Sequence, residues 1–576
     1  MYQKVHAIRP TTLTALAQGT LVAAFLLASA STSAQPADAQ SGAAPAVSTT
    51  ASGGFEEGLR AELDSYIQNA LTEFDVPGAA VAILKDGKVA YRGAFGQRGD
   101  QHPAPVDSQT LFMIGSVTKS MTATMTGTLV DDGILSWDAP VKQYLPTFAL
   151  AVPEYSESVT LRHLLSHQSG VSRRDIALFL AADRPLEMLQ AVSTLPVHSA
   201  PGQSYEYQNQ MYALSGLITA RAAGARLTNQ SLEKTYERLM QTRLFDRVGM
   251  PRTTLDFDRA MHSPNHAWPN EFSPLEGRVT HVQPSFENFA TGVAAAGGVW
   301  SNIDDMARYA LMQVSEGKNP EGRRVISEAA LEETHTQMVP GEQGGYGLGW
   351  GVALTPFGKL IQHSGGTAGF GCDVALSPEH DWGIVVLTNR ASSTWFVQAV
   401  ENYAASVLLG IERRDDAELL NAEAAFRAQI SQLVALTVPA SRAEVAQYLG
   451  AYEGGISVGL RGSDLIIRTS LGELQARPVP AYPGGFVMVG NVLSGAVAYF
   501  ASDEAGNMTL TLGALATEGE EVSILQPETR AKLPPGTRPQ RPRGFPQVFQ
   551  DGWREMARQL HARGVHWHKH HPELFR

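Results

Sequence analysis

Three short patterns in the sequence combine residue types that can perform nucleophilic chemistry. The first pattern is Ser116-Val117-Thr118-Lys119. Residues three apart share one face of a helix, so the Lys119 amine can reach the Ser116 hydroxyl. A serine hydroxyl is a poor nucleophile until a base removes its proton, and a lysine is such a base only when it is neutral. Because burial favours the neutral amine, the pattern predicts a buried Ser116–Lys119 pair suited to acyl transfer.

The other two patterns supply groups that such a pair needs. Tyr207-Gln208-Asn209 is the one Y-x-N in the sequence, and the Pro-Gly turn before it would place it on a loop. A phenol has a pKa of about 10 and acts as a base only beside cations, so Tyr207 fits a position next to Lys119. His363-Ser364-Gly365-Gly366 ends a predicted strand. Its small residues leave room for a substrate, and the Gly366 N–H is a candidate oxyanion donor opposite the Ser116 N–H.

Each pattern also has a purely structural interpretation. S-x-x-K occurs twice more, at 231–234 and 315–318, where acidic residues indicate an exposed surface. An isolated Y-x-N more often marks a buried tyrosine than a catalytic one. His163 and His167 have the i, i+4 spacing of a helical zinc pair, but no H-E-x-x-H signature is present. We therefore expect both histidines to be structural, and we expect neither a metal nor another cofactor.

In this order, S-x-x-K, Y-x-N and H-x-G resemble the motifs of serine β-lactamase-like hydrolases with the penicillin-binding-protein fold. Two further stretches support the resemblance, LRHLLSHQSG at 161–170 and AGGVWS at 296–301. The similar branch contains class C β-lactamases, DD-peptidases, D-aminopeptidases and esterases. The resemblance covers roughly residues 60–405.

The resemblance implies a role for each candidate residue. Ser116 would be acylated, Lys119 and Tyr207 would share the proton transfers, and Asn209 would position the substrate. His363 stands where true β-lactamases usually carry a lysine, and a neutral histidine holds a substrate carboxylate less well than a cation does. We therefore expect a secreted serine hydrolase, first a D-amino-acid or DD-peptidase-like amidase. The alternatives are a carboxylesterase, a weak β-lactamase, and a non-catalytic protein that binds peptidoglycan or peptides.

Strand patterns at both ends of the main domain, with helical patterns between them, indicate an α/β or α+β unit. By resemblance this is the β-lactamase/penicillin-binding-protein fold, an antiparallel sheet flanked by helices with an added all-helical region. Short strands and turns beyond it suit a small antiparallel β-barrel, similar to a lipocalin-like domain. The predicted units are a signal peptide (1–34), a linker (35–54), the hydrolase domain (55–411), a helical connector (412–440), the β-barrel (441–526) and a Pro/Arg-rich, His-rich tail (527–576).

The composition and the N-terminal segment indicate which classes of partner the protein binds and where it acts. The 576 residues carry a formal charge of −12, which offers no basic excess for nucleic acid. Cys372 is the one cysteine, so a disulfide framework within the chain is excluded. The basic start, short apolar run and small residues of 1–34 predict export to the periplasm or beyond, without a lasting membrane span. We expect a small peptide, amide or ester substrate. The C-terminal domain is a candidate for capping the active site or for oligomerisation.

Overall fold

The computed structural model describes residues 57–535 except 181–183, 342–343, 356–357, 411–412, 414, 481, 504 and 519–520. The predicted signal peptide, the predicted linker and the part of the predicted tail beyond residue 535 lie outside the described residues. No helix within the described part of the chain is long and apolar enough to cross a membrane.

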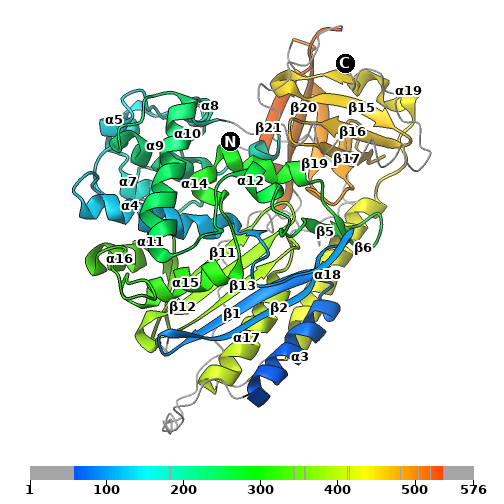
Figure 1. The fold of residues 1–576 in the computed structure, drawn as a ribbon. Helices are drawn as coiled ribbons and strands as arrows, with labels where there is room; N and C mark the ends of the chain where they lie inside the picture. Colours follow the sequence, from blue (N-terminus) through cyan, green and yellow to red (C-terminus); the bar gives the residue numbers. More distant parts are fainter. Residues whose placement is uncertain are drawn as a thin grey trace.

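The main domain is organised on a nine-stranded antiparallel sheet (Figure 1). Its strands, in spatial order, are β3 (His102–Pro105), β2 (Lys88–Gly99), β1 (Gly78–Lys85), β13 (Trp382–Thr388), β12 (Gly371–Ser377), β11 (Gly358–Gly366), β10 (Gly351–Thr355), β9 (Gly344–Tyr346) and β8 (Val339–Gly341). β1 pairs with β13 from Ala79 opposite Thr388 to Lys85 opposite Trp382. The strands predicted at the two ends of the domain therefore lie side by side within one sheet.

Helices cover both faces of this sheet. Because side chains alternate along a strand, Val81 and Ile83 of β1 pack into one core while Ala82 and Leu84 pack into another. The first core also contains α3 (Glu57–Glu73) and α17 (Thr394–Leu409). The second contains α4 (Thr118–Asp131), α9 (Asn209–Ala222) and α15 (Ile303–Val314). A strand buried on both faces explains the near-continuous apolar run of β1.

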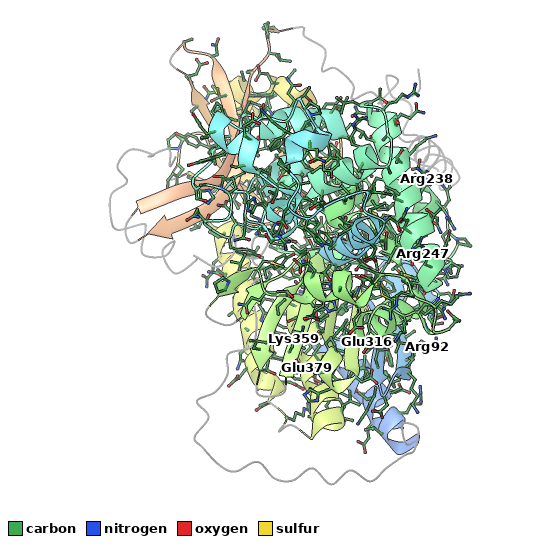
Figure 2. The ribbon with its side chains drawn as sticks, turned by 90° about the vertical axis from the view of Figure 1, so that its left-hand side faces the viewer. Arg92, Arg238, Arg247, Glu316, Lys359 and Glu379 are labelled. Carbon is green, nitrogen blue, oxygen red and sulfur yellow. The ribbon has the colours of Figure 1, made fainter. Side chains whose placement is uncertain are left out.

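The remaining short elements between β3 and β8 form the helical region beside the sheet. They include α5 (Val141–Tyr144), α6 (Pro153–Ser158), α7 (Leu161–Leu165), α8 (Pro185–Val192), α10 (Asn229–Leu239), α11 (Asp246–Val248), α12 (Phe257–Met261), α13 (Phe289–Gly292), α14 (Ala294–Gly297), α16 (Glu328–His335) and the strand pairs β4 (Phe112–Met113) with β7 (Trp300–Ser301) and β5 (Asn270–Ser273) with β6 (Arg278–His281). Figure 2 shows charged side chains of both signs on one flank, with Arg238 and Arg247 above Glu316 and Lys359 near Glu379. This flank therefore presents mixed charge.

The C-terminal domain is an eight-stranded antiparallel sheet in sequential order. Its strands are β14 (Gly450–Ala451), β15 (Ser457–Arg461), β16 (Asp464–Arg468), β17 (Glu473–Pro478), β18 (Gly485–Met488), β19 (Val497–Ser502), β20 (Met508–Glu518) and β21 (Glu521–Ala531). The sheet curls until the Leu533 N–H donates to the Ala451 carbonyl at 2.8 Å. This curled half-barrel confirms the predicted small barrel domain. The sheet runs beyond residue 526, the expected boundary, because Ala531 still pairs with Thr509.

A single helix, α18 (Asp416–Ala435), joins the two domains. Its apolar side chains Phe426, Ile430 and Leu433 pack against Val487 and Val497 of the C-terminal sheet. The connector is therefore seated on the second domain by a buried apolar contact.

Candidate active site

The turn that carries Ser116 lies tightly against the end of β11. Ser116 belongs to a short 3-10 helix, η1 (Gly115–Val117), which continues into α4. A Cβ on Gly365 would lie 2.0 Å from the Ile114 carbonyl oxygen, and a Cβ on Gly115 would lie 2.8 Å from the Gly366 nitrogen. Gly115 also has φ +50°, which favours glycine. The glycines thus allow η1 and β11 to approach backbone to backbone.

Lys119 lies one turn along, with its amine fully buried beside Ser116. Its Nζ is 2.9 Å from the Ser116 Oγ, 2.7 Å from the Asn209 Oδ1 and 2.8 Å from the Ala296 carbonyl oxygen. Burial lowers the pKa of Lys119 well below its usual value, Asp175 opposes this change, and Arg173 adds to it. The environment therefore favours a neutral amine in hydrogen-bond contact with a serine hydroxyl.

Asn209, the first residue of α9, connects Lys119 to a charged pair. Its Nδ2 donates to the Asp175 Oδ1 at 2.9 Å. The other Asp175 oxygen accepts from the Arg173 Nε at 2.6 Å. Because the Asn209 amide oxygen accepts from Lys119 while its nitrogen donates to Asp175, the amide has one orientation that satisfies both neighbours. The carboxylate thereby orients the residue that holds the lysine.

Tyr207 is buried directly beside Lys119. The Lys119 Nζ lies 4.7 Å from the Tyr207 ring centroid, and the Arg173 guanidinium carbon lies 4.9 Å from it. Burial raises the pKa of Tyr207, and the nearby Ser116 hydroxyl and Arg173 oppose that rise. The phenol oxygen has no hydrogen-bond partner among the described residues. The tyrosine is therefore held as a neutral phenol at ordinary pH.

His167 packs against the same tyrosine, with ring centroids 4.2 Å apart. Its Nδ1 accepts a hydrogen bond from the Gln208 N–H at 3.1 Å. An Nδ1 that accepts from an amide carries no proton, so the ring is neutral with its proton on Nε2. His167 adopts φ +59° after α7 has ended, and His163 caps the start of that helix through a bond from the Thr160 N–H. The two histidines therefore do not share a helix face as the spacing predicted.

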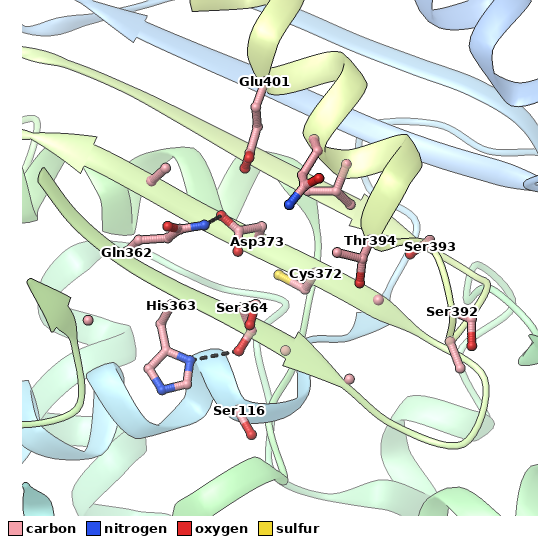
Figure 3. Close-up of a pocket in the computed structure, with 18 of the residues that line it drawn as sticks. Ser116, Gln362, His363, Ser364, Cys372, Asp373, Ser392, Ser393, Thr394 and Glu401 are labelled. Atoms are coloured by element: carbon pink, nitrogen blue, oxygen red, sulfur yellow. Dashed lines mark hydrogen bonds between the residues drawn. The ribbon is translucent and has the colours of Figure 1, made fainter. Parts of the chain in front are cut away.

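His363 lies near the end of β11 on the side of the sheet that faces Ser116 (Figure 3). Its Nδ1 donates to the Ser364 carbonyl oxygen at 2.6 Å, because a carbonyl can only accept. Its Nε2 then accepts from the Tyr346 hydroxyl at 2.9 Å. Burial, with a contribution from Lys119, lowers the pKa of His363 to about 3. The imidazole is therefore neutral at physiological pH.

A cavity of about 1130 Å³ opens beside these groups. Its wall includes Ser116, Asn209, His363 and Gly366. Its lining also includes Asp373 and Glu401, which lie on the other side of the strand from Ser116 (Figure 3). Leucine, phenylalanine and tyrosine side chains also line the cavity, and one of them, Leu493, comes from the C-terminal domain. These residues are Leu178, Phe179, Tyr205, Phe272, Phe289, Tyr346 and Leu493.

The structure brings all six residues singled out in the sequence to this region, although they come from three separate segments. Ser116, Lys119 and Asn209 are joined by direct hydrogen bonds. The Tyr207 and His363 rings lie 6.3 Å apart, and Gly366 lies against the turn that carries Ser116. The two other S-x-x-K matches have separate local roles, since Ser231 accepts from the Arg226 N–H and Lys318 pairs with Glu316.

Four neighbours of the site were not predicted as functional. They are His167, Arg173, Asp175 and Tyr346. The first three lie within or directly after the LRHLLSHQSG stretch, so that segment was the available signal. Tyr346 follows Gly344 and Gly345 and had no local signal, because only the pairing of β9, β10 and β11 places it beside His363.

Comparisons with known proteins show which family the chain resembles. The family model described as beta-lactamase matches residues 63–409. The chain is 26% identical to unguisins hydrolase ungD' of Aspergillus campestris over 61% of this chain and 64% of that protein, which is less than two thirds of its length. It is 27% identical to a beta-lactamase of Escherichia coli over 55% of this chain and 84% of that protein.

Among solved structures, the octameric penicillin-binding protein homologue from Pyrococcus abyssi has a similar fold. The match has a TM-score of 0.53 and 23% sequence identity, and covers 80% of this chain and 99% of that chain. At this low sequence identity, the match shows that the two chains share a fold. It spans more of the chain than the family model does.

Proposed function

The chain belongs to the beta-lactamase family, and from this premise we propose that it is a serine hydrolase that forms an acyl-enzyme on Ser116. The observation that carries the proposal is the 2.9 Å contact between the Lys119 Nζ and the Ser116 Oγ in a fully buried setting. A buried lysine with a lowered pKa can accept a proton at neutral pH, whereas a solvated lysine cannot.

In the proposed acylation, the Ser116 Oγ attacks the substrate carbonyl carbon while its proton passes to the Lys119 Nζ. The new carbon–oxygen bond forms as the carbonyl oxygen gains negative charge. The N–H groups of Ser116 and Gly366 are our candidates for the oxyanion donors, because the Gly115 turn lies against Gly366. Removal of one such donor typically slows an enzyme by about 10²- to 10³-fold.

We assign Tyr207 the role of proton donor to the leaving group. Its raised pKa keeps the phenol protonated, so it can give a proton to the departing nitrogen as the amide C–N bond breaks. The proton taken up by Lys119 then restores the phenol. Hydrolysis of the acyl-enzyme reverses these transfers with water in place of the amine.

We favour a small peptide-like amide of the D-amino-acid or DD-peptidase kind as the substrate class. The neutral His363 supplies no fixed positive charge where true β-lactamases usually have a lysine, which supports a peptidase over a β-lactamase. An ester would use the same nucleophile and oxyanion donors. Steady-state rates with D-amino-acid amides, short acyl esters and a chromogenic cephalosporin distinguish these substrates directly.

The test of the nucleophile is covalent labelling by a serine-reactive fluorophosphonate, followed by intact mass and peptide mapping. We expect one adduct on Ser116 in the wild type and none in Ser116→Ala. Ser231→Ala and Ser315→Ala, from the two other S-x-x-K matches, are matched controls and should label fully. A label that persists in Ser116→Ala at another residue would overturn the assignment.

We also propose that the enzyme acts outside the cytoplasm, in the periplasm or as a secreted protein. The support is the predicted signal peptide at 1–34, with cleavage near Ala34. N-terminal sequencing of the protein from fractionated cells tests this. A cytoplasmic protein that retains Met1 would contradict it.

A further inference from the structure

Two segments of the main domain hold the candidate catalytic residues through a set of mutual hydrogen bonds. Residues 172–175 form one segment and residues 206–210, which carry Tyr207 and Asn209, form the other. Four bonds link them: Gln208 Nε2 to the Ser172 carbonyl (3.1 Å), the Arg173 N–H to Glu206 (2.5 Å), Asn209 Nδ2 to Asp175 (2.9 Å) and Gln210 Nε2 to the Arg174 carbonyl (2.9 Å). Movement of one segment must therefore disturb the other.

The C-terminal domain contacts the first segment through an ion pair whose carboxylate is buried. The Arg174 Nη2 and Nε lie 2.5 and 2.7 Å from the Glu528 Oε1. Glu528 belongs to β21, and only 6% of its side chain is exposed. Its other oxygen accepts from Arg530 of the same strand at 3.1 Å. The carboxylate is thus fixed between the sheet and the loop that precedes η2 (Asp175–Phe179).

We propose that Glu528 is a positioning residue for the acylation reaction, acting through Arg174 on the segment that orients Asn209 and Tyr207. The inference rests on the proposed function of Ser116 and Lys119. Its physical basis is that a charge-assisted bond to a buried carboxylate restrains a loop more strongly than a neutral bond does. Because Asp175 is adjacent to Arg174 and holds Asn209, a shift of Arg174 changes the position of the Lys119 acceptor. The C-terminal domain would then help to position the active-site residues of the main domain.

Glu528→Gln keeps the side-chain shape and removes the charge. We expect the acylation rate, measured by stopped-flow single turnover, to fall about tenfold, because small misplacements of catalytic groups are costly. We expect KM to change little, since Glu528 touches no substrate. We also expect a shifted pH–rate profile, because Asp175 and Arg173 both act on the Lys119 pKa. A residue that served stability alone would leave that profile unchanged.

Arg174→Met breaks the same link from the other domain and provides a second variant if Glu528→Gln folds poorly. The double variant should acylate no more slowly than the worse single variant, because both remove one interaction. Arg461→Gln is the matched control, since it removes an exposed ion pair with Glu473 in the same C-terminal sheet and leaves Glu528 untouched. It should acylate at the wild-type rate.

The outcomes separate this inference from the proposed function. If the wild type forms no adduct at Ser116, the proposed function fails. If the wild type acylates and both Glu528→Gln and Arg174→Met retain its rate and pH profile, the positioning role is wrong. Strictly additive losses in the double variant would equally overturn it.

Discussion

At the scale of single residues, the site combines a serine with an amine that burial has made less basic. The two hydrogens of a neutral Lys119 amine can go to the Asn209 Oδ1 and the Ala296 carbonyl oxygen, which leaves its lone pair for the Ser116 proton. Among the described residues no carboxylate touches the amine directly, because Asn209 stands between it and Asp175. A neutral amide spacer orients the amine without pairing it with a full negative charge, which would raise its pKa. This arrangement explains how a fully buried lysine can remain a base.

Lys119→Met should slow acylation of Ser116 by about 10³-fold, within the range for loss of a general base. In the wild type the rate should rise with pH as Lys119 loses its proton. The rate should level off well below pH 10.5, because the pKa is lowered from that value. Single-turnover rates measured between about pH 5 and about pH 10 give this pH–rate profile. Lys234→Met, which changes an exposed side chain of α10, should behave as wild type. Equal losses in both variants would reject the role of Lys119.

At the scale of elements, the site depends on contact between the η1 turn and β11. The H-S-G-G pattern ends a predicted strand, and its small residues were expected to leave room for a substrate. The structure adds a second reason for them, since Gly365 faces the Ile114 carbonyl oxygen at a distance that no side chain could tolerate. The same glycines therefore set the approach of the strand that carries His363 to the helix that carries Ser116.

Gly365→Ala should lower the free energy of unfolding by about 3 kcal/mol, the upper range for overpacking, because the new Cβ would meet backbone rather than a flexible side chain. It should also reduce labelling of Ser116. Gly366→Ala is the matched control for stability, since its Cβ would meet nothing within 4 Å. Urea unfolding curves measure both. A Gly365→Ala protein as stable as Gly366→Ala would show that η1 and β11 do not approach so closely.

At the scale of the whole molecule, several histidines are buried in the neutral state. Burial lowers the pKa of both His363 and His335 to about 3. Between about pH 6.5 and 3 the unfolded chain binds protons that these folded side chains do not. Their contribution to stability is therefore complete above pH 6.5 and is lost as the pH falls toward 3.

His335→Gln tests this at a residue outside the site, where its Nε2 lies 2.9 Å from the Gln313 Oε1. The difference in unfolding free energy between wild type and variant should shrink by about 1.4 kcal/mol per pH unit below pH 6.5. Urea unfolding at about pH 7, 6 and 5 measures these unfolding free energies on both sides of the ordinary histidine pKa of about 6.5. The exposed His380 gives the control His380→Gln. A difference that stays constant with pH would contradict the buried neutral state of His335.

Local patterns were enough to predict much of this protein. The strands at the two ends of the main domain and the small C-terminal β domain follow from local strand patterns and turn residues. Ser116 and Lys119 follow from helical spacing, because residues three apart are neighbours whatever the rest of the chain does. Such features depend on residues that are close together in the sequence, so local patterns are enough to predict them.

The tertiary structure alone decided which distant groups act on these residues. Nothing near Asn209 in the sequence indicates Asp175, and nothing near Arg174 indicates Glu528 of the second domain. The i, i+4 spacing of His163 and His167 does not place them on one helix face, because α7 ends at Leu165 and the chain turns before His167. Contacts of this kind depend on how complete elements pack together. Packing depends on many weak interactions throughout the core, so it cannot be predicted from a short stretch of sequence.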